Sequence, residues 1–133
     1  MSDDAGFIFL VNHATQDECL LSGVGGLPAG SRPLAESVAR GSAVFVYNTS
    51  SKVMHGPFEA EERGGWELDP QAFGGRLPAQ VLFRVRRGRV PAALPLHAVA
   101  HALSFSTGNK FSQRLSASQV CALARALLCS PAR

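Results

Sequence analysis

Runs of apolar residues separated by short polar breaks mark the strands expected in this chain. Residues 43–48 form an apolar, β-branched and aromatic run, and residues 52–60 form a second one. The short stretch of polar residues between them is typical of a turn, so the two runs predict an antiparallel hairpin. Side chains alternate between faces along a strand, which places the two valines of the first run on one face and Phe45 with Tyr47 on the other. Both faces are apolar, which predicts a hairpin inside a sheet that is covered on both sides.

Two further runs predict strands outside this hairpin. Residues 6–11 carry no polar side chain, as expected for a central, buried strand. Residues 79–86 alternate, so that Val81 and Phe83 share an apolar face while the opposite face is half-polar and basic. The glycine- and proline-rich residues 23–30 predict a loop.

Capping signals and apolar periodicity predict four short helices. The first helix pairs Thr15 with Glu18 in a capping box, and the last begins with a second capping box at Ser116 and Gln119. The other two helices are expected over residues 34–39 and 95–103. We therefore expect an α+β fold in which a small, curved or barrel-like, mostly antiparallel sheet is flanked by short helices.

Composition indicates one small folded domain over residues 1–133. A chain of 133 residues buries roughly two-thirds of its unfolded surface. Its 46% hydrophobic and 17% charged residues are typical of a globular protein and exclude a disordered one. The formal net charge of +3 permits an anionic partner without requiring one.

The number and spacing of the cysteines and the lengths of the apolar segments indicate the cellular compartment in which the protein is expected. Cys19, Cys121 and Cys129 are odd in number and have no metal-finger spacing, so free thiols in a reducing compartment are expected. All three fall in expected helices, where a small buried side chain is the simplest interpretation. No apolar run is long enough for a signal-peptide core or for a membrane span of about 20 residues. We expect an intracellular protein, cytoplasmic or nuclear, without a membrane partner.

Several catalytic and cofactor patterns are incomplete. Among the glycines of residues 23–30, a dinucleotide fingerprint would need glycine where Pro28 stands, and the chain lacks Gly-Lys-Ser/Thr. His97 and His101 have the spacing of two zinc ligands on a helix, but Ala98 stands where a zinc protease has glutamate. A Gly-x-Ser-x-Gly elbow is also absent. We expect no catalytic residue, cofactor or metal, and we favour packed or exposed histidines over a structural zinc site.

Arginines gather near two aromatic residues in the second half of the chain. Trp66 and Phe73 lie in the glycine-containing stretch before the strand at 79–86. Arginine close to exposed aromatic rings is typical of proteins that bind single-stranded nucleic acid, since it combines phosphate neutralisation with base stacking. Alternatively, the two rings plug the bottom of the sheet and the arginines form a solvated face. The arginines concerned are Arg63, Arg76, Arg84, Arg86, Arg87 and Arg89.

Four short motifs follow one another along the chain, Gly25-Gly26-Leu27-Pro28, Val44-Phe45-Val46, Pro78-Ala79-Gln80-Val81 and Pro95-Leu96-His97-Ala98. Their order resembles that of the plant DCD (development and cell death) domain, and the likeness covers essentially the whole chain. Two positions depart from the family pattern, because Gly25 replaces a phenylalanine and Ala98 replaces a glutamate. The resemblance implies a non-enzymatic module of plant or algal proteins, linked to stress response, development and programmed cell death. The matching residues are Gly26, Leu27, Pro28, Phe45, His55, Gly56, Phe58, Glu59, Pro78, Ala79, Gln80, Val81, Pro95 and Leu96.

At the level of fold, the order of elements also resembles the YTH and EVE branch of PUA-like domains. That resemblance implies a compact barrel that binds RNA or modified bases, with Trp66, Phe73 and Tyr47 as candidate walls of an aromatic cage. The arginine-rich strand would then follow the phosphates. RNA or a modified nucleotide is therefore the expected ligand. The alternative is a protein-interaction module that docks a partner through its Gly-Leu-Pro loop.

Overall fold

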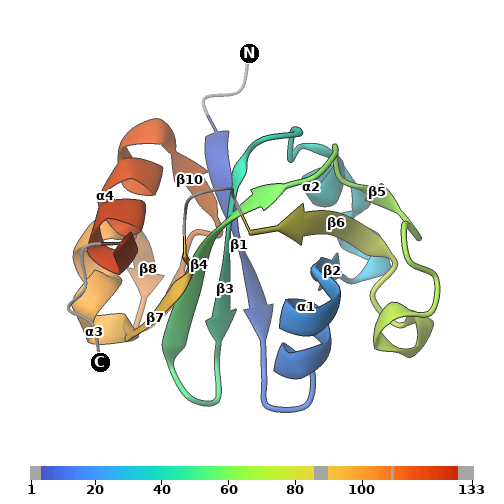
Figure 1. Cartoon of the computed structure of the whole chain (residues 1–133), viewed down its shortest axis with the longest axis horizontal. Helices are drawn as coiled ribbons and strands as arrows, with labels where there is room; N and C mark the ends of the chain where they lie inside the picture. Colours follow the sequence, from blue (N-terminus) through green and yellow to red (C-terminus); the bar gives the residue numbers. More distant parts are fainter. Residues whose placement is uncertain (1–3, 86–89, 109, 129–133) are drawn as a thin grey trace.

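Eight strands form one curved sheet with helices on both faces (Figure 1), within residues 4–85, 90–108 and 110–128 that the computed structural model describes. The strand order is β10-β1-β3-β4-β6-β2, with β5 also paired to β6 and β7 also paired to β4. The β1–β3 pair is parallel and the other pairs are antiparallel. The strands of this sheet are β1 (Asp4–Val11), β2 (Val24–Leu27), β3 (Ala43–Asn48), β4 (Val53–Ala60), β5 (Gly65–Trp66), β6 (Ala79–Arg84), β7 (Ala92–Pro95) and β10 (Arg114–Ser116).

A separate two-stranded hairpin and a set of short helices complete the fold. It is the predicted α+β class, with a curved and mostly antiparallel sheet. The hairpin consists of β8 (Phe105–Thr107) and β9 (Lys110–Phe111). The helices are α1 (Gln16–Ser22), α2 (Arg32–Glu36), α3 (Leu96–Val99) and α4 (Ala117–Leu128), with 3-10 turns η1 (Ala29–Ser31), η2 (Ala72–Gly75) and η3 (Ala100–Ala102).

The hairpin predicted at residues 43–60 is confirmed as β3 and β4. Its turn is closed by Asn48, whose side-chain oxygen accepts hydrogen bonds from the backbone N–H groups of Ser50 and Ser51 at 2.8 and 3.0 Å. The amide nitrogen of the same buried side chain donates to Gln16 Oε1 at 2.7 Å. One asparagine therefore fixes the turn and attaches it to α1.

Strand alternation produces two separate cores, one on each side of the sheet. On the α1 side, Phe7, Phe9, Val44 and Val46 pack with buried residues of α1, α2, β2 and β6. On the α4 side, the side chains that alternate with these along β1 and β3 pack with α3, α4 and β10. This confirms the prediction of a sheet covered on both faces. The α4-side core contains Ile8, Phe45, Tyr47, Met54, Val99, Ala102, Leu115, Leu123 and Leu127.

The prediction of a loop over residues 23–30 is wrong, because residues 24–27 form strand β2, which pairs with β6. Its glycines allow close packing and do not make a turn. A Cβ atom on Gly25 would lie 2.5 Å from the ring of Phe9, and one on Gly26 would lie 2.9 Å from the ring of Phe73. The Phe9 ring thus fills the space beside Gly25, where the family pattern has an aromatic side chain.

Each of the four expected helices has a counterpart in the structure, and two of them differ from the predicted bounds. In α4, the predicted capping box is present: Gln119 N donates to Ser116 Oγ at 3.2 Å, and Ser116 N donates to Gln119 Oε1 at 3.0 Å. The helix expected over 95–103 stops after Val99, whose φ of −120° leaves the α region, and continues only as the 3-10 turn η3. The helix expected over 34–39 is observed as α2, two residues earlier.

Two details of the helix predictions need correction. Thr15 makes no capping hydrogen bond at the start of α1, and its expected partner Glu18 contacts another segment instead. Cys19 is buried as expected, whereas Cys121 is exposed on α4. Cys129 lies outside the described residues.

Candidate nucleic-acid interface

Trp66 lies at the end of β5, where its backbone pairs with Ala79 of β6. The indole is half-buried, so part of the ring reaches the surface. The guanidinium carbon of Arg32, from α2, lies 4.9 Å from the centroid of the indole ring. A guanidinium at this distance is attracted to the π face of tryptophan. Residues 34 positions apart therefore form a stacked, cationic and aromatic pair at the surface.

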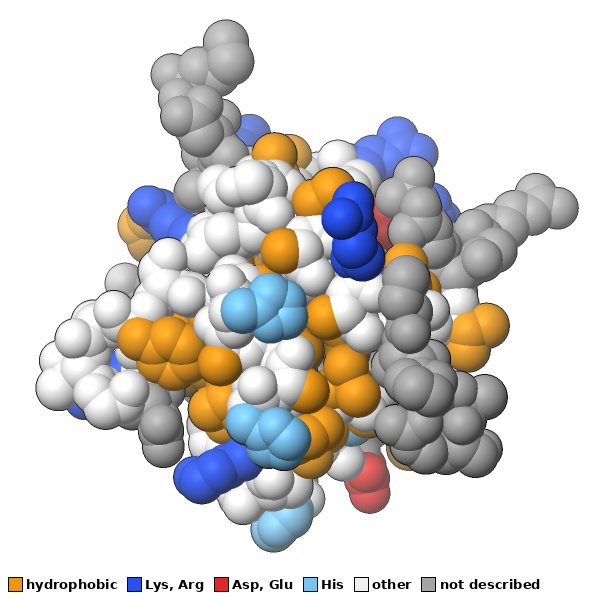
Figure 2. Space-filling view, turned by 90° about the vertical axis from the view of Figure 1, so that its left-hand side faces the viewer, with side chains coloured by type: hydrophobic (Ala, Val, Ile, Leu, Met, Phe, Trp, Pro, Cys, Tyr) orange, Lys and Arg blue, Asp and Glu red, His pale blue; other side chains and the backbone are white. Residues whose placement is uncertain are grey.

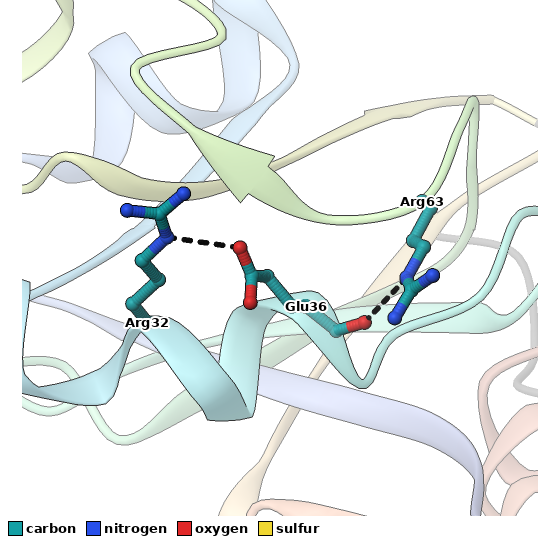
Figure 3. Close-up of polar contacts among 3 residues, drawn as sticks. All are labelled: Arg32, Glu36 and Arg63. Atoms are coloured by element: carbon teal, nitrogen blue, oxygen red, sulfur yellow. Dashed lines mark hydrogen bonds and ion pairs between the residues drawn. The ribbon is translucent and has the colours of Figure 1, made fainter.

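Glu36 organises the arginines around this pair (Figure 3). Arg32 Nε contacts Glu36 Oε2 at 2.9 Å, and Arg63 Nε donates to the backbone carbonyl oxygen of Glu36 at 2.9 Å. Each arginine is thus held through Nε, and its terminal nitrogens have no partner in the described part of the chain. Trp66, Arg32 and Arg63 form what we call the Trp66 surface. Its charged neighbourhood is mixed, because Glu36 contacts Arg32 and the exposed Glu62 and Glu67 directly adjoin Arg63 and Trp66 in the sequence.

Gln80 fixes the loop that follows Trp66. Its side chain is only 1% exposed and is satisfied entirely by backbone groups. Asp69 N donates to Gln80 Oε1 at 2.7 Å, and Gln80 Nε2 donates to the carbonyl oxygens of Asp69 and Leu77, both at 3.0 Å. The glutamine of the Pro-Ala-Gln-Val motif therefore closes the segment 69–77 into a fixed loop, and it does so from the strand that pairs with β5.

Phe73 is buried inside this loop and is not available for stacking. Its ring packs on Gly26, and its backbone has a positive φ of 55° that L-residues rarely adopt. The carboxylate of Glu18 accepts the Phe73 N–H at 2.7 Å and holds this conformation from α1. The interpretation of Phe73 as a buried plug is thus the better one.

The expected cage of Trp66, Phe73 and Tyr47 is not assembled. Phe73 belongs to the core on the α1 side of the sheet, and Tyr47 belongs to the core on the α4 side. Tyr47 points away because alternation along β3 places it opposite Val46. Tyr47 packs instead against Phe111 of β9, with ring centroids 5.1 Å apart.

The arginine strand is described only in part. Arg84 is exposed at the end of β6, and its Nη2 lies 3.4 Å from Glu59 Oε1, so its charge is partly neutralised. Arg86, Arg87 and Arg89 lie outside the described residues. Arg32 was missed from the sequence, although its spacing of four residues from Glu36 is the spacing of a helical ion pair.

The other motif residues have structural roles. Leu27 is buried in β2 and only Pro28 of the Gly-Leu-Pro motif is exposed, which leaves little surface for docking a partner there. Gly56 lies against the Phe45 ring, and a Cβ atom added to this glycine would be 2.7 Å from that ring. His55 Nε2 is buried with no hydrogen-bond partner in the described chain, and burial lowers the pKa of this imidazole.

Remaining motif residues pack the same framework. Phe58 contacts Phe83 with ring centroids 5.0 Å apart. Pro78 precedes β6, and Ala79 and Val81 are buried in it. Pro95 ends β7 against Val53, and Leu96 N donates to the carbonyl oxygen of Lys52 at 2.9 Å.

His97 and His101 are both exposed, and the described residues contain no group of three or more side chains able to hold a metal ion. Within the same residues, no helix is long and apolar enough to cross a membrane.

Comparison with known proteins places the sequence among plant domains. A family model described as the development and cell death domain matches residues 5–127. The B2 protein of Daucus carota is 36% identical over 89 residues, which cover 62% of this chain and 43% of that protein. The DCD domain-containing protein NRP of Arabidopsis thaliana is 32% identical over 125 residues, covering 89% of this chain and 35% of that protein. The chain spans less than half the length of these relatives.

Solved structures with a similar fold include YTH domains. The Pho92 YTH domain in complex with m6A aligns with a TM-score of 0.68 at 10% identity, over 99% of this chain and 88% of that one. The YTH domain of the Zygosaccharomyces rouxii MRB1 protein, in complex with N6-methyladenosine RNA, aligns with a TM-score of 0.65 at 13% identity, over 96% and 88% of the two chains. At such identities the likeness concerns the fold, and it confirms the expected resemblance to the YTH branch.

Proposed function

Because the chain belongs to the development and cell death domain family, we propose that it acts as a non-enzymatic binding module, and that its ligand is single-stranded RNA or a modified nucleotide. The observation that carries this proposal is the stack of Arg32 on Trp66 at 4.9 Å. It places a cation over the face of a half-buried aromatic ring, a combination that suits a base and its phosphate together. The YTH structures solved with m6A and with N6-methyladenosine RNA support the same ligand class.

In this proposal each residue of the Trp66 surface has a distinct role. A base stacks on the platform made by Trp66 and the guanidinium plane of Arg32. Arg63 and the terminal nitrogens of Arg32 contact the phosphates on either side. Glu36 positions both arginines and does not contact the ligand. Gln80 keeps the loop beside the platform in one conformation.

The test is fluorescence anisotropy with a short single-stranded RNA at low and physiological salt. We expect affinity to fall steeply as salt rises, because phosphate contacts release counterions. Trp66→Ala should weaken binding by about 1–3 kcal/mol, the usual contribution of one stacked base. Arg125→Gln removes one exposed charge on α4, on the opposite flank of the sheet from β5, and serves as the control.

An affinity unchanged by Trp66→Ala, or equal losses of affinity in Trp66→Ala and Arg125→Gln, would overturn the assignment of the Trp66 surface. A flat titration at both salt concentrations would overturn RNA as the ligand. The docking of a protein partner through the Gly-Leu-Pro loop is not favoured, because Gly26 and Leu27 are packed in β2. We also propose that the module works inside the cell, where Cys19 and Cys121 stay as free thiols.

A further inference from the structure

A groove opens where the core on the α4 side ends, at the carboxyl ends of β1 and β3. The β8–β9 hairpin forms its other wall through Phe111, which packs against Tyr47. The groove has a volume of about 320 Å³, at the small end of the range for ligand pockets, about 300–1,000 Å³. It shares no residue with the Trp66 surface, and Figure 1 shows β8 and β5 on opposite flanks of the sheet. Its lining residues are Leu10, Tyr47, Thr49, Lys110, Phe111 and Gln113.

The groove exposes apolar and aromatic surface that the core does not cover. Leu10 lies beside Tyr47 in the β1–β3 register and is 44% exposed. Phe105 is 41% exposed and contacts Phe111 edge to face, with ring centroids 5.9 Å apart. Figure 2, which faces the α3–α4 flank, likewise shows hydrophobic side chains at the surface among histidines and few acidic groups. Aromatic side chains at a partly open wall provide edges and faces for a flat ring.

The polar atoms of the groove include a cation, a donor and an acceptor that the described chain leaves unused. Lys110 is exposed and lies within ion-pair distance of no described carboxylate. Gln113 Nε2 donates to the Ile8 carbonyl oxygen at 2.9 Å, which fixes the side chain and leaves its own Oε1 as a free acceptor. The Tyr47 hydroxyl has no partner in the described residues, and this side chain, 5% exposed, supplies the donor at the base of the groove.

We propose that this groove is a nucleotide site. A nucleotide combines a flat ring, hydrogen-bonding edges and an anionic group, which match the aromatic, amide and ammonium groups of the lining. The ring packs against Leu10 and Phe111, the base edge meets Gln113 Oε1 and the Tyr47 hydroxyl, and the phosphate pairs with Lys110. The nucleotide is either free or one residue of an RNA strand. The proposal does not depend on the Trp66 surface, since either site could be lost without the other.

The experiment is a titration of the isotope-labelled protein, followed by 1H–15N NMR, with adenosine 5′-monophosphate and with a pentaadenylate RNA. We expect shifts at the backbone amides of Thr49, Lys110 and Gln113. Lys110→Gln should weaken binding of the monophosphate about tenfold, because one charge-assisted contact is lost. Lys52→Gln makes the same charge change outside the groove and should leave the affinity unchanged. Both lysines are exposed, so neither change is expected to affect folding.

The outcomes separate the two sources and the two sites. Groove shifts with the monophosphate alone indicate a free nucleotide, and tighter groove binding of the pentaadenylate indicates an RNA strand. If the amide signals of the groove do not shift with either ligand, the proposal is overturned. Equal losses of affinity in Lys110→Gln and Lys52→Gln would overturn it as well. Chemical-shift changes at the Trp66 indole N–H without any at the groove amides would also overturn the nucleotide site, and they would support the Trp66 surface. Groove shifts that persist in Trp66→Ala support the nucleotide site even if the Trp66 surface binds nothing.

Discussion

The two sides of the sheet expose aromatic residues in different ways. On the α1 side, Trp66 is held by backbone pairing to β6 and by a loop that Gln80 fixes with buried hydrogen bonds. On the α4 side, Tyr47 and Phe111 meet through ring contact, and the β8–β9 hairpin forms no strand pairing with the main sheet among the described residues. One surface is therefore fixed by polar groups, and the other is held largely by apolar packing.

The largest contrast is expected between the two described cysteines. Burial, aided by the nearby Glu18 carboxylate, raises the pKa of the Cys19 thiol to about 12. Such a thiol is ionised roughly a thousand-fold less at neutral pH than an ordinary cysteine, and the thiolate is the reactive form. Cys121 is exposed on α4. Timed alkylation with N-ethylmaleimide and peptide mapping should show rapid labelling of Cys121 and labelling of Cys19 only after denaturation.

Rapid labelling of Cys19 in the native protein would mean that α1 opens from the sheet. The polar attachment of the α1 side would then be weaker than its hydrogen bonds indicate. Cys121→Ser provides a control in which the signal from the exposed thiol is absent.

The next contrast compares two glutamines, Gln80 beside the Trp66 loop and Gln113 in the groove on the α4 side. Gln80→Met leaves the Asp69 N–H and the carbonyl oxygens of Asp69 and Leu77 without their partner, and we expect a loss of about 2–4 kcal/mol in the free energy of unfolding. Gln113→Met removes a single hydrogen bond to Ile8, at a half-buried site, and should cost about 1 kcal/mol. Urea unfolding curves measure both. Equal losses would show that the two sides depend on polar groups to the same degree.

The framework was predictable because strand alternation reports burial directly. The apolar run of β3, with Val44 on one side and Phe45 on the other, was sufficient to predict a sheet covered on both faces. The pattern failed where spatial proximity decides the structure. Gly25 and Gly26 look like a turn, and only the Phe9 and Phe73 rings packed on them explain a strand. These contacts join residues far apart in the chain, and no local pattern encodes them.

The candidate site was predictable only in part, for the same reason. Trp66 was identified because arginines and glycines lie near it in the sequence, but its partner Arg32 precedes it by 34 residues. Phe73 and Tyr47 were grouped with it because both are aromatic, although opposite faces of the sheet separate them. A motif shows which residue types are present. The side on which each side chain emerges depends on the pairing of β3 and β6 with their neighbours.

A third contrast concerns pH and two histidines. Burial lowers the pKa of His55 in the folded protein, so the folded state binds a proton less readily than the unfolded chain. The full stability is present above the unfolded pKa of about 6.5, and it is lost as the pH falls toward the lower folded-state pKa. His97 is exposed on α3. Melting curves between about pH 7.5 and 5 should therefore show a smaller acid-induced loss in His55→Gln, and an unchanged loss in His97→Gln.

The smallest expected effect is the coupling between Arg32 and Trp66. A double-mutant cycle with Arg32→Lys and Trp66→Leu isolates the stacking contribution, because lysine keeps the charge and its ion pair with Glu36 but loses the guanidinium plane. At a surface site we expect a coupling of about 0.5–1 kcal/mol in the free energy of unfolding. The parallel cycle with Arg63→Lys should give a coupling near zero, since Arg63 contacts the Glu36 carbonyl and not the indole. Equal couplings in the two cycles would indicate that positive charge near Trp66 matters and that the stack itself does not. In that case the planar platform, on which the proposed base would lie, would have no energetic basis on the α1 side.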